Sequence, residues 1–222
     1  MKLNKNGAIL YQGPSLLDGK PIVVIVTGLV NASKNDKTGA MLQTWIIRSD
    51  ISPKAAVYSG QDKSICGDCP HRLRLWGEPK YLTKAVRTCY VNLRTVITVK
   101  KCFDRGGYAK ADKATVHLIR SKHLRMGSYG DPAAVPYGVW KLILPKEKRH
   151  RTGYTHQWAS PDTDERLKGI LMASADTPEE RLRAQAMGWR TFEVRPLDAG
   201  PGEGFQCPSD PTRDKHVSCE KC

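Results

Sequence analysis

The chain has 222 residues, of which 40% are hydrophobic and 26% charged, a balance that excludes a disordered chain and allows one sizeable core. Its formal net charge of +14 is unusual. Residues 1–125 hold 22 Lys and Arg against 8 Asp and Glu, whereas residues 126–222 hold 14 against 14. This confined excess favours a polyanion, namely nucleic acid, as substrate or partner. A basic surface that merely keeps the protein soluble is the simpler alternative.

The N-terminus shows no apolar core of a signal peptide behind its charges. The first apolar run, residues 21–30, has the length of a strand and is too short to span a bilayer. We therefore expect a cytoplasmic protein with reduced cysteines and without a membrane partner.

In the first part of the chain, residues 21–28 and 41–47 are predicted to be strands. The polar loop over residues 31–39 lacks the Gly-Lys-Ser/Thr ending of a P-loop. Residues 61–72 are predicted to be a cysteine-bearing loop. Residues 92–102 fit a helix or a strand, because Val, Ile and Thr dominate them.

In the second part, strand-like and helix-like segments alternate. Strands are predicted over residues 123–129, 153–158, 170–175 and 189–194, and a helix over residues 137–144. A second helix begins with the capping box Thr177-Pro-Glu-Glu180 and ends at Gly188. This order predicts an α/β fold, either a mostly parallel sheet or a partial (β/α) barrel.

Three polar side chains follow successive predicted strands. Asp131, His156 and Asp176 fall at the carboxyl ends, where such folds carry their chemistry, so we predict them as catalytic residues. Each has a simpler explanation: a turn residue in Gly130-Asp131-Pro132, a core histidine, and a residue that helps to begin a helix.

Six of the seven cysteines form two triplets, and Cys102 stands alone. Each triplet contains a Cys-x-x-Cys pair, the spacing with which two thiolates grip one zinc ion or an iron–sulfur cluster. His71 and His216 lie close enough in sequence to complete the coordination. The predicted metal ligands are thus Cys66, Cys69, Cys89 and His71 in the first site, and Cys207, His216, Cys219 and Cys222 in the second. Disulfides, buried thiols and a redox-active Cys66–Cys69 pair remain alternatives.

Basic residues surround the first triplet and are interleaved with Trp76, Tyr81 and Tyr90, which offer stacking surfaces for bases. The predicted nucleic-acid contacts are Arg72, Arg74, Lys84, Arg87, Lys100 and Lys101.

Composition also predicts the domain organisation. Residues 1–195 are expected to form a single α/β domain with a basic first part, residues 1–125. Residues 196–222 are rich in Pro, Gly, Asp and Cys, cannot build a core, and are predicted to be a metal-binding tail.

Several motifs resemble a family of phage and prophage proteins: Ser64-Ile-Cys-Gly-Asp-Cys-Pro-His-Arg72, Cys89-Tyr-Val-Asn92, Gly127-Ser-Tyr-Gly-Asp-Pro132, Thr152-Gly-Tyr-Thr-His-Gln-Trp158, Gly188-Trp-Arg-Thr-Phe192 and the Cys207…Cys222 tail. The resemblance covers nearly the whole chain and implies a phage protein of the host cytoplasm. At the level of fold, the chain is also similar to radical S-adenosylmethionine enzymes and to zinc-bearing transglycosylases. The former similarity implies S-adenosylmethionine as a cofactor, although the Cys-x3-Cys-x2-Cys motif of those enzymes is absent.

Three functions follow from these observations. The first is an enzyme that modifies nucleic acid or a nucleotide at an iron–sulfur or zinc site. The second is a non-catalytic, zinc-stabilised protein that binds nucleic acid or a host factor. The third is a thiol oxidoreductase built on Cys66 and Cys69.

Overall fold

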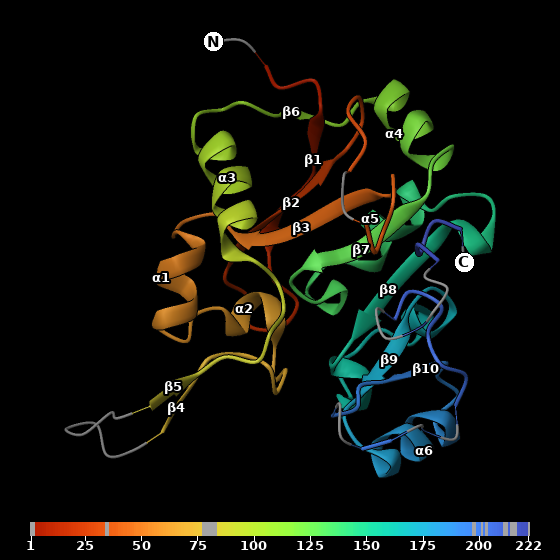
Figure 1. Cartoon of the computed structure of the whole chain (residues 1–222). Coiled ribbons are helices and arrows are strands. Elements are labelled where there is room, and N and C mark those ends of the chain that lie inside the picture. Colours follow the sequence, from red (N-terminus) through yellow and green to blue (C-terminus); the bar gives the residue numbers. More distant parts are fainter. Residues whose placement is uncertain are drawn as a thin grey trace.

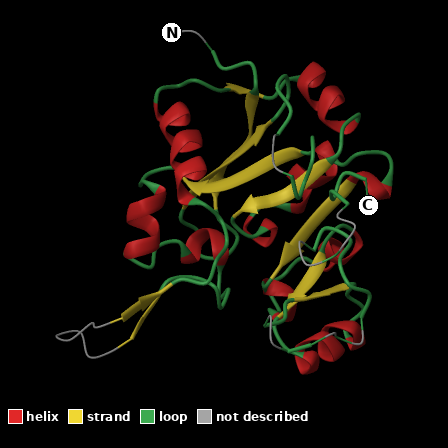
Figure 2. Cartoon of the chain, viewed as in Figure 1, coloured by secondary structure: helices red, strands yellow, loops and turns green. Residues whose placement is uncertain are grey.

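The computed structural model describes residues 3–33, 36–76, 84–196, 199–200, 202, 204–210, 213 and 217–221 (Figures 1 and 2). Its centre is one sheet formed by β1 (Gly7–Pro14), β2 (Pro21–Thr27), β3 (Leu42–Arg48), β6 (Ala109–Lys110), β7 (Leu124–Tyr129), β8 (Arg151–Thr155), β9 (Met172–Ala175) and β10 (Thr191–Glu193). The eight strands lie in the order β10-β9-β8-β7-β3-β2-β1-β6. A separate hairpin pairs β4 (Arg74–Trp76) with β5 (Lys84–Val86).

The sheet has two parts that differ in strand direction. Strands β1, β2 and β3 are an antiparallel meander. From β3 through β7, β8 and β9 to β10 every neighbouring pair is parallel. The predicted α/β fold with a mostly parallel sheet is therefore confirmed. The sheet is open, with β10 and β6 at its edges, so the first of the two predicted architectures describes it.

The helices are α1 (Pro53–Tyr58), α2 (Lys63–Cys66), α3 (Leu93–Asp104), α4 (Lys113–Arg120), α5 (Tyr137–Ile143) and α6 (Pro178–Ala186). Helix α3 packs against β3 and against α1, and α6 packs against β9 and β10 (Figure 1). Within the described residues, no helix is both long and apolar enough to span a bilayer.

Helix α3 resolves the ambiguity of residues 92–102. The side chain of Asn92 accepts a hydrogen bond from the backbone N–H of Arg94 and caps the helix. Val96, Val99 and Lys100 are buried at helical spacing, so the β-branched residues of this segment pack one helix face into the core.

The predicted strands over residues 21–28 and 41–47 form the centre of the hydrophobic core as β2 and β3. Strands β2 and β3 are buried along nearly their whole length, which explains their continuous apolar runs. Trp140 is fully buried, and its indole N–H donates to the carbonyl of Pro132 at 3.0 Å. Cys102, the cysteine outside both triplets, is also a buried core residue.

The regular sheet ends at Glu193, and the described residues beyond it contain no helix or strand. The tail returns to the loop that precedes β3. The N–H of Cys219 donates to the carbonyl of Lys37 at 2.8 Å, and the Glu220 carboxylate accepts from the N–H of Ala40 at 2.7 Å.

Candidate functional site

Helix α2 delivers the first two cysteines. It ends at Cys66, and a turn follows in which the N–H of Cys69 donates to the carbonyl of Cys66 at 3.3 Å. This turn brings both thiols of the Cys-x-x-Cys pair to one end of a short helix. The local geometry agrees with the spacing on which the metal prediction depends.

The cysteine loop docks on the carboxyl ends of two parallel strands. The N–H of Asp131, after β7, donates to the carbonyl of Ile65 at 2.5 Å, and the Gln157 amide, after β8, donates to the carbonyl of Cys66 at 3.2 Å. Two glycines permit this approach. A Cβ at Gly67 would lie 2.3 Å from the Gln157 amide carbon, and one at Gly130 would lie 3.2 Å from the carbonyl oxygen of Ile65.

The β4–β5 hairpin returns the chain to the same place. Arg74 pairs with Val86 at the base of the hairpin, and Trp76 pairs with Lys84 farther out. The hairpin projects from the body of the molecule (Figure 2). At its base the N–H of Cys89 donates to the carbonyl of His71 at 3.0 Å. The hairpin therefore brings Cys89 beside the Cys66–Cys69 turn despite their separation in sequence.

The Cys66 thiol lies in a buried environment with negative charges around it. The pKa of Cys66 lies well above its usual value, first because the thiol is buried and then because Asp62, Cys69, Cys89 and Asp131 add negative charge around it. A bound cation reverses this effect, since it stabilises thiolates directly. Cys69 and Cys89 are thus close enough to act on the charge of Cys66.

A second cluster lies against the first and consists of His71, His156 and Asp176. Their ligand atoms all lie within 4.8 Å of one another. The Asp176 carboxylate is 2.9 Å from Nε2 of His71 and 3.4 Å from Nε2 of His156. The cluster joins the loop of the first triplet to the ends of β8 and β9. Two of the three predicted catalytic residues therefore meet.

The electrostatics of this cluster favour a charge-separated pair. Burial acts to lower the pKa of His156, but the nearby Asp176 carboxylate, 3.4 Å from Nε2, and Cys69 outweigh it and raise the pKa to about 10. Burial acts to raise the pKa of Asp176, yet the two histidines hold it below its usual value. His156 thus connects the carboxylate of one cluster to a thiol of the other.

Asp131, the third predicted catalytic residue, lies buried between the ends of β7 and β8. Its carboxylate is buried, and it accepts from the N–H of Ala133 at 2.9 Å and from the N–H of His156 at 2.8 Å. Burial raises the pKa of this carboxyl group, and the backbone hydrogen bonds oppose that effect. Asp131 thus fixes the strand end that carries His156, and its catalytic role stays a prediction.

His71 is also placed differently from the fourth ligand that we predicted. Both of its ring nitrogens are engaged, Nε2 with Asp176 and Nδ1 with the hydroxyl of Thr88 at 2.8 Å. If Nε2–H donates to the carboxylate, Nδ1 accepts from the hydroxyl. His71 therefore binds a metal ion only if one of these contacts breaks.

Tyr129, which we did not predict, belongs to this region. The residue is 3% exposed, and its hydroxyl has no hydrogen-bond partner among the described residues. Burial raises the pKa of its hydroxyl, and the charge of the nearby Cys66 raises it further. A buried phenol without a partner beside thiols fits a donor to a metal-bound sulfur or ligand. Its only signal in the sequence is its place at the end of β7.

The second triplet is described only in part. Cys207 and Cys219 lie near Tyr154 of β8, where they add to the effect of burial and raise the pKa of its hydroxyl. The Ser209 hydroxyl is 3.3 Å from the Cys219 sulfur. The other two predicted ligands, His216 and Cys222, lie outside the described residues.

The predicted nucleic-acid contacts divide into two groups. The first group binds other residues of the chain and consists of Arg72, Arg87 and Lys100. The Arg72 guanidinium binds Asp62 at 2.6 Å, Arg87 donates to the carbonyls of Cys89 and Val91, and the buried Lys100 pairs with Asp104. These partners make Arg72 and Lys100 braces of the fold, and their contact with nucleic acid stays a prediction.

Arg74 and Lys101 are exposed and stay available as nucleic-acid contacts. Lys84 belongs to β5, but its side chain lies outside the described residues, as do the side chain of Trp76 and the whole of Tyr81.

Searches against protein-family models, curated proteins and solved structures find no match to this chain. The resemblance to phage proteins therefore stays a prediction, and the function is argued from the site itself.

Proposed function

We propose that this chain is a metal-dependent enzyme that modifies nucleic acid or a nucleotide. Its metal, zinc or an iron–sulfur cluster, would be held by the thiolates of Cys66, Cys69 and Cys89. The observation that carries the proposal is the joining of these thiols to the His71–Asp176–His156 cluster at the carboxyl ends of β7, β8 and β9.

The donor set supports a metal. Burial raises the pKa of the Cys66 thiol, and the charges of Asp62, Cys69, Cys89 and Asp131 raise it further. A cation relieves this repulsion. Within the described residues, the three sulfurs do not form a group as tight as the 4.8 Å of the His71 cluster, so metal binding would draw them together.

An open coordination position supports catalysis over a purely structural role. The histidine nearest in sequence, His71, is bonded at both ring nitrogens. Three protein ligands then leave one position for substrate, water or a small cofactor such as S-adenosylmethionine. The His156–Asp176 pair beside Cys69 offers an acid and a base for proton transfer.

Charge supports a nucleic-acid substrate. Residues 1–125 hold 22 basic against 8 acidic residues, and this part of the chain contains Cys66, Cys69 and Cys89. Arg74, exposed at the start of the hairpin, lies close in sequence to the ligands. Phosphates bound there would place a base near the thiols.

Anaerobic purification of the full chain tests the metal site. We expect a metal centre, measured as iron, zinc and sulfide and by absorbance, that is lost in Cys66→Ser, Cys69→Ser and Cys89→Ser. Cys102→Ser is the matched control, because Cys102 is buried in the core outside both triplets. If Cys219→Ser loses metal, that metal is bound by the second triplet in the tail. No metal, or retention in all three thiol variants, would refute the ligand assignment.

Mass spectrometry of nucleosides tests the enzymatic part. Cells that produce the wild-type chain should contain a modified nucleoside that is absent with His156→Ala, while His156→Ala keeps its metal. If zinc has four protein ligands, and no nucleoside differs between the two cultures, the non-catalytic binding protein replaces the enzyme.

A further inference from the structure

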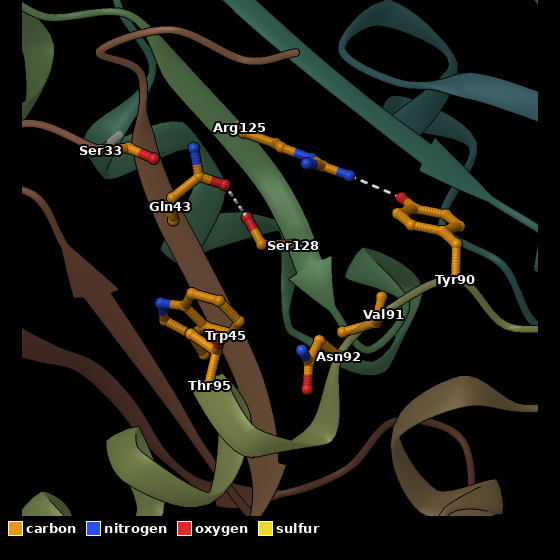
Figure 3. A pocket seen from close by; sticks show the side chains of 9 residues that line it. All are labelled: Ser33, Gln43, Trp45, Tyr90, Val91, Asn92, Thr95, Arg125 and Ser128. Carbon is orange, nitrogen blue, oxygen red and sulfur yellow. Dashed lines mark hydrogen bonds between the residues drawn. The ribbon is translucent and has the colours of Figure 1, made fainter. Parts of the chain in front are cut away.

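A cavity of about 330 Å³ opens beside the thiol site, over the β3–β7 part of the sheet (Figure 3). Gln43 and Trp45 of β3 and Arg125 and Ser128 of β7 form its floor. One wall consists of Tyr90, Val91, Asn92 and Thr95. Its volume is at the lower end of the range for small-ligand sites, which is roughly 300–1,000 Å³. It has room for one nucleotide unit.

The lining combines an aromatic floor with polar groups of fixed orientation. The indole N–H of Trp45 donates to the hydroxyl of Thr27 at 2.8 Å, which fixes the ring. The Ser128 hydroxyl donates to the side-chain amide oxygen Oε1 of Gln43 at 2.6 Å, and both residues are buried. Among the residues that line the cavity, Arg125 is the charged one. An aromatic surface and a single cation suit a planar ring that carries an anionic group.

Arg125 and Tyr90 span the cavity, as Figure 3 shows. The guanidinium donates to the Tyr90 hydroxyl at 2.5 Å, and the Tyr90 residue is 76% exposed. A phosphate is a stronger acceptor for a guanidinium than a phenol, because the hydrogen bonds are charge-assisted and bidentate. A phosphate can therefore displace the phenol and free the exposed Tyr90 ring for stacking.

The cavity adjoins the thiol site through the chain itself. Tyr90 follows Cys89 directly, and Trp45 pairs in register with Tyr129, the phenol beside Cys66. Two lining residues of the cavity are thus direct neighbours of residues in the thiol site.

We propose that this cavity binds one nucleotide unit of the substrate, with its base stacked on the exposed Tyr90 ring and its phosphate at Arg125. This inference rests on the proposed function and narrows its substrate to a nucleotide held by a stacked base and one phosphate.

Isothermal titration calorimetry of the anaerobically purified full chain tests it, with the common nucleoside 5′-monophosphates and the matching nucleosides as probes. We expect at least one monophosphate to bind. Arg125→Gln should weaken it about tenfold or more while changing nucleoside binding little. Arg94→Gln is the control, because Arg94 is an exposed arginine in the first turn of α3 that does not line the cavity.

Metal analysis of the same samples separates this inference from the proposed function. Loaded metal without monophosphate binding, or equal weakening by Arg125→Gln and Arg94→Gln, would overturn the nucleotide site and leave the metal site intact. Monophosphate binding that depends on Arg125 in a chain without metal would uphold the cavity and refute the metal-dependent function.

Discussion

Gly130 lies where the cysteine loop meets the sheet, and its replacement by alanine is expected to loosen that junction. The backbone there has a φ of 81°. A Cβ would lie 2.7 Å from the Cβ of Ile46, 2.8 Å from the carbonyl oxygen of Ile46 and 3.2 Å from that of Ile65. These contacts are with backbone atoms or with a Cβ, so no flexible side-chain end can move aside.

The expected loss of stability has two parts. A non-glycine residue at such a φ costs about 1–2 kcal/mol. Forcing an extra methyl group into packed surroundings adds about 1–3 kcal/mol. Gly130→Ala should therefore lower the free energy of unfolding by about 2–5 kcal/mol.

Gly188→Ala measures the cost of the backbone conformation alone. Gly188 has a φ of 83°, but no atom lies within 4 Å of a Cβ built there. Urea unfolding should show that Gly130→Ala loses at least about 1 kcal/mol more than Gly188→Ala. Bound metal should also fall with Gly130→Ala alone. Equal losses in the two variants would show that Ile46 and Ile65 do not pack this closely around Gly130.

Three further predictions separate residues that brace the fold from those that act on a ligand. Arg72→Ala should lower the free energy of unfolding by about 3 kcal/mol, because it leaves the buried Asp62 carboxylate unpaired. An unchanged midpoint of urea unfolding would contradict this stabilising role of Arg72. Arg74→Ala should keep the stability but weaken binding to a single-stranded oligonucleotide and lower the salt slope by about 1, whereas an unchanged slope would exclude this contact. Hydrogen bonding to Arg48 lowers the pKa of Asp50, so the wild type should be more stable than Asp50→Asn above about pH 4. That difference should disappear as the pH falls through the lowered pKa, and a pH-independent difference would contradict the ion pair.

The sequence predicts the second part of the fold well, because local signals determine it. The capping box at Thr177 is formed, with the Thr177 hydroxyl accepting from the N–H of Glu180 at 3.1 Å. The strand ends that carry His156 and Asp176 lie side by side, as parallel strands require. Short or weakly patterned elements were missed, namely β1, β6, α1, α4 and the β4–β5 hairpin. Helix α2 was also missed, since residues 61–72 were predicted to be a loop.

The candidate site is less predictable, since it depends on contacts between distant segments. Nothing near His71 indicates that its ring meets Asp176, which follows a strand far along the chain. Composition also cannot distinguish a basic side chain that braces the fold from one that faces solvent. Arg72 and Lys100 are of the first kind, whereas Arg74 is exposed.

The hairpin that carries Arg74 at its base has a consequence for how related sites can be recognised. Because β4 and β5 pair antiparallel and Cys89 bonds to His71 at their foot, residues added or removed in matched pairs between Trp76 and Lys84 leave the cysteines where they are. The number of residues between Cys69 and Cys89 is therefore free to change in evolution while the site is kept. A search for similar sites should fix the turn at Cys66–Cys69 and the residues after β7, β8 and β9, and should let that spacer vary.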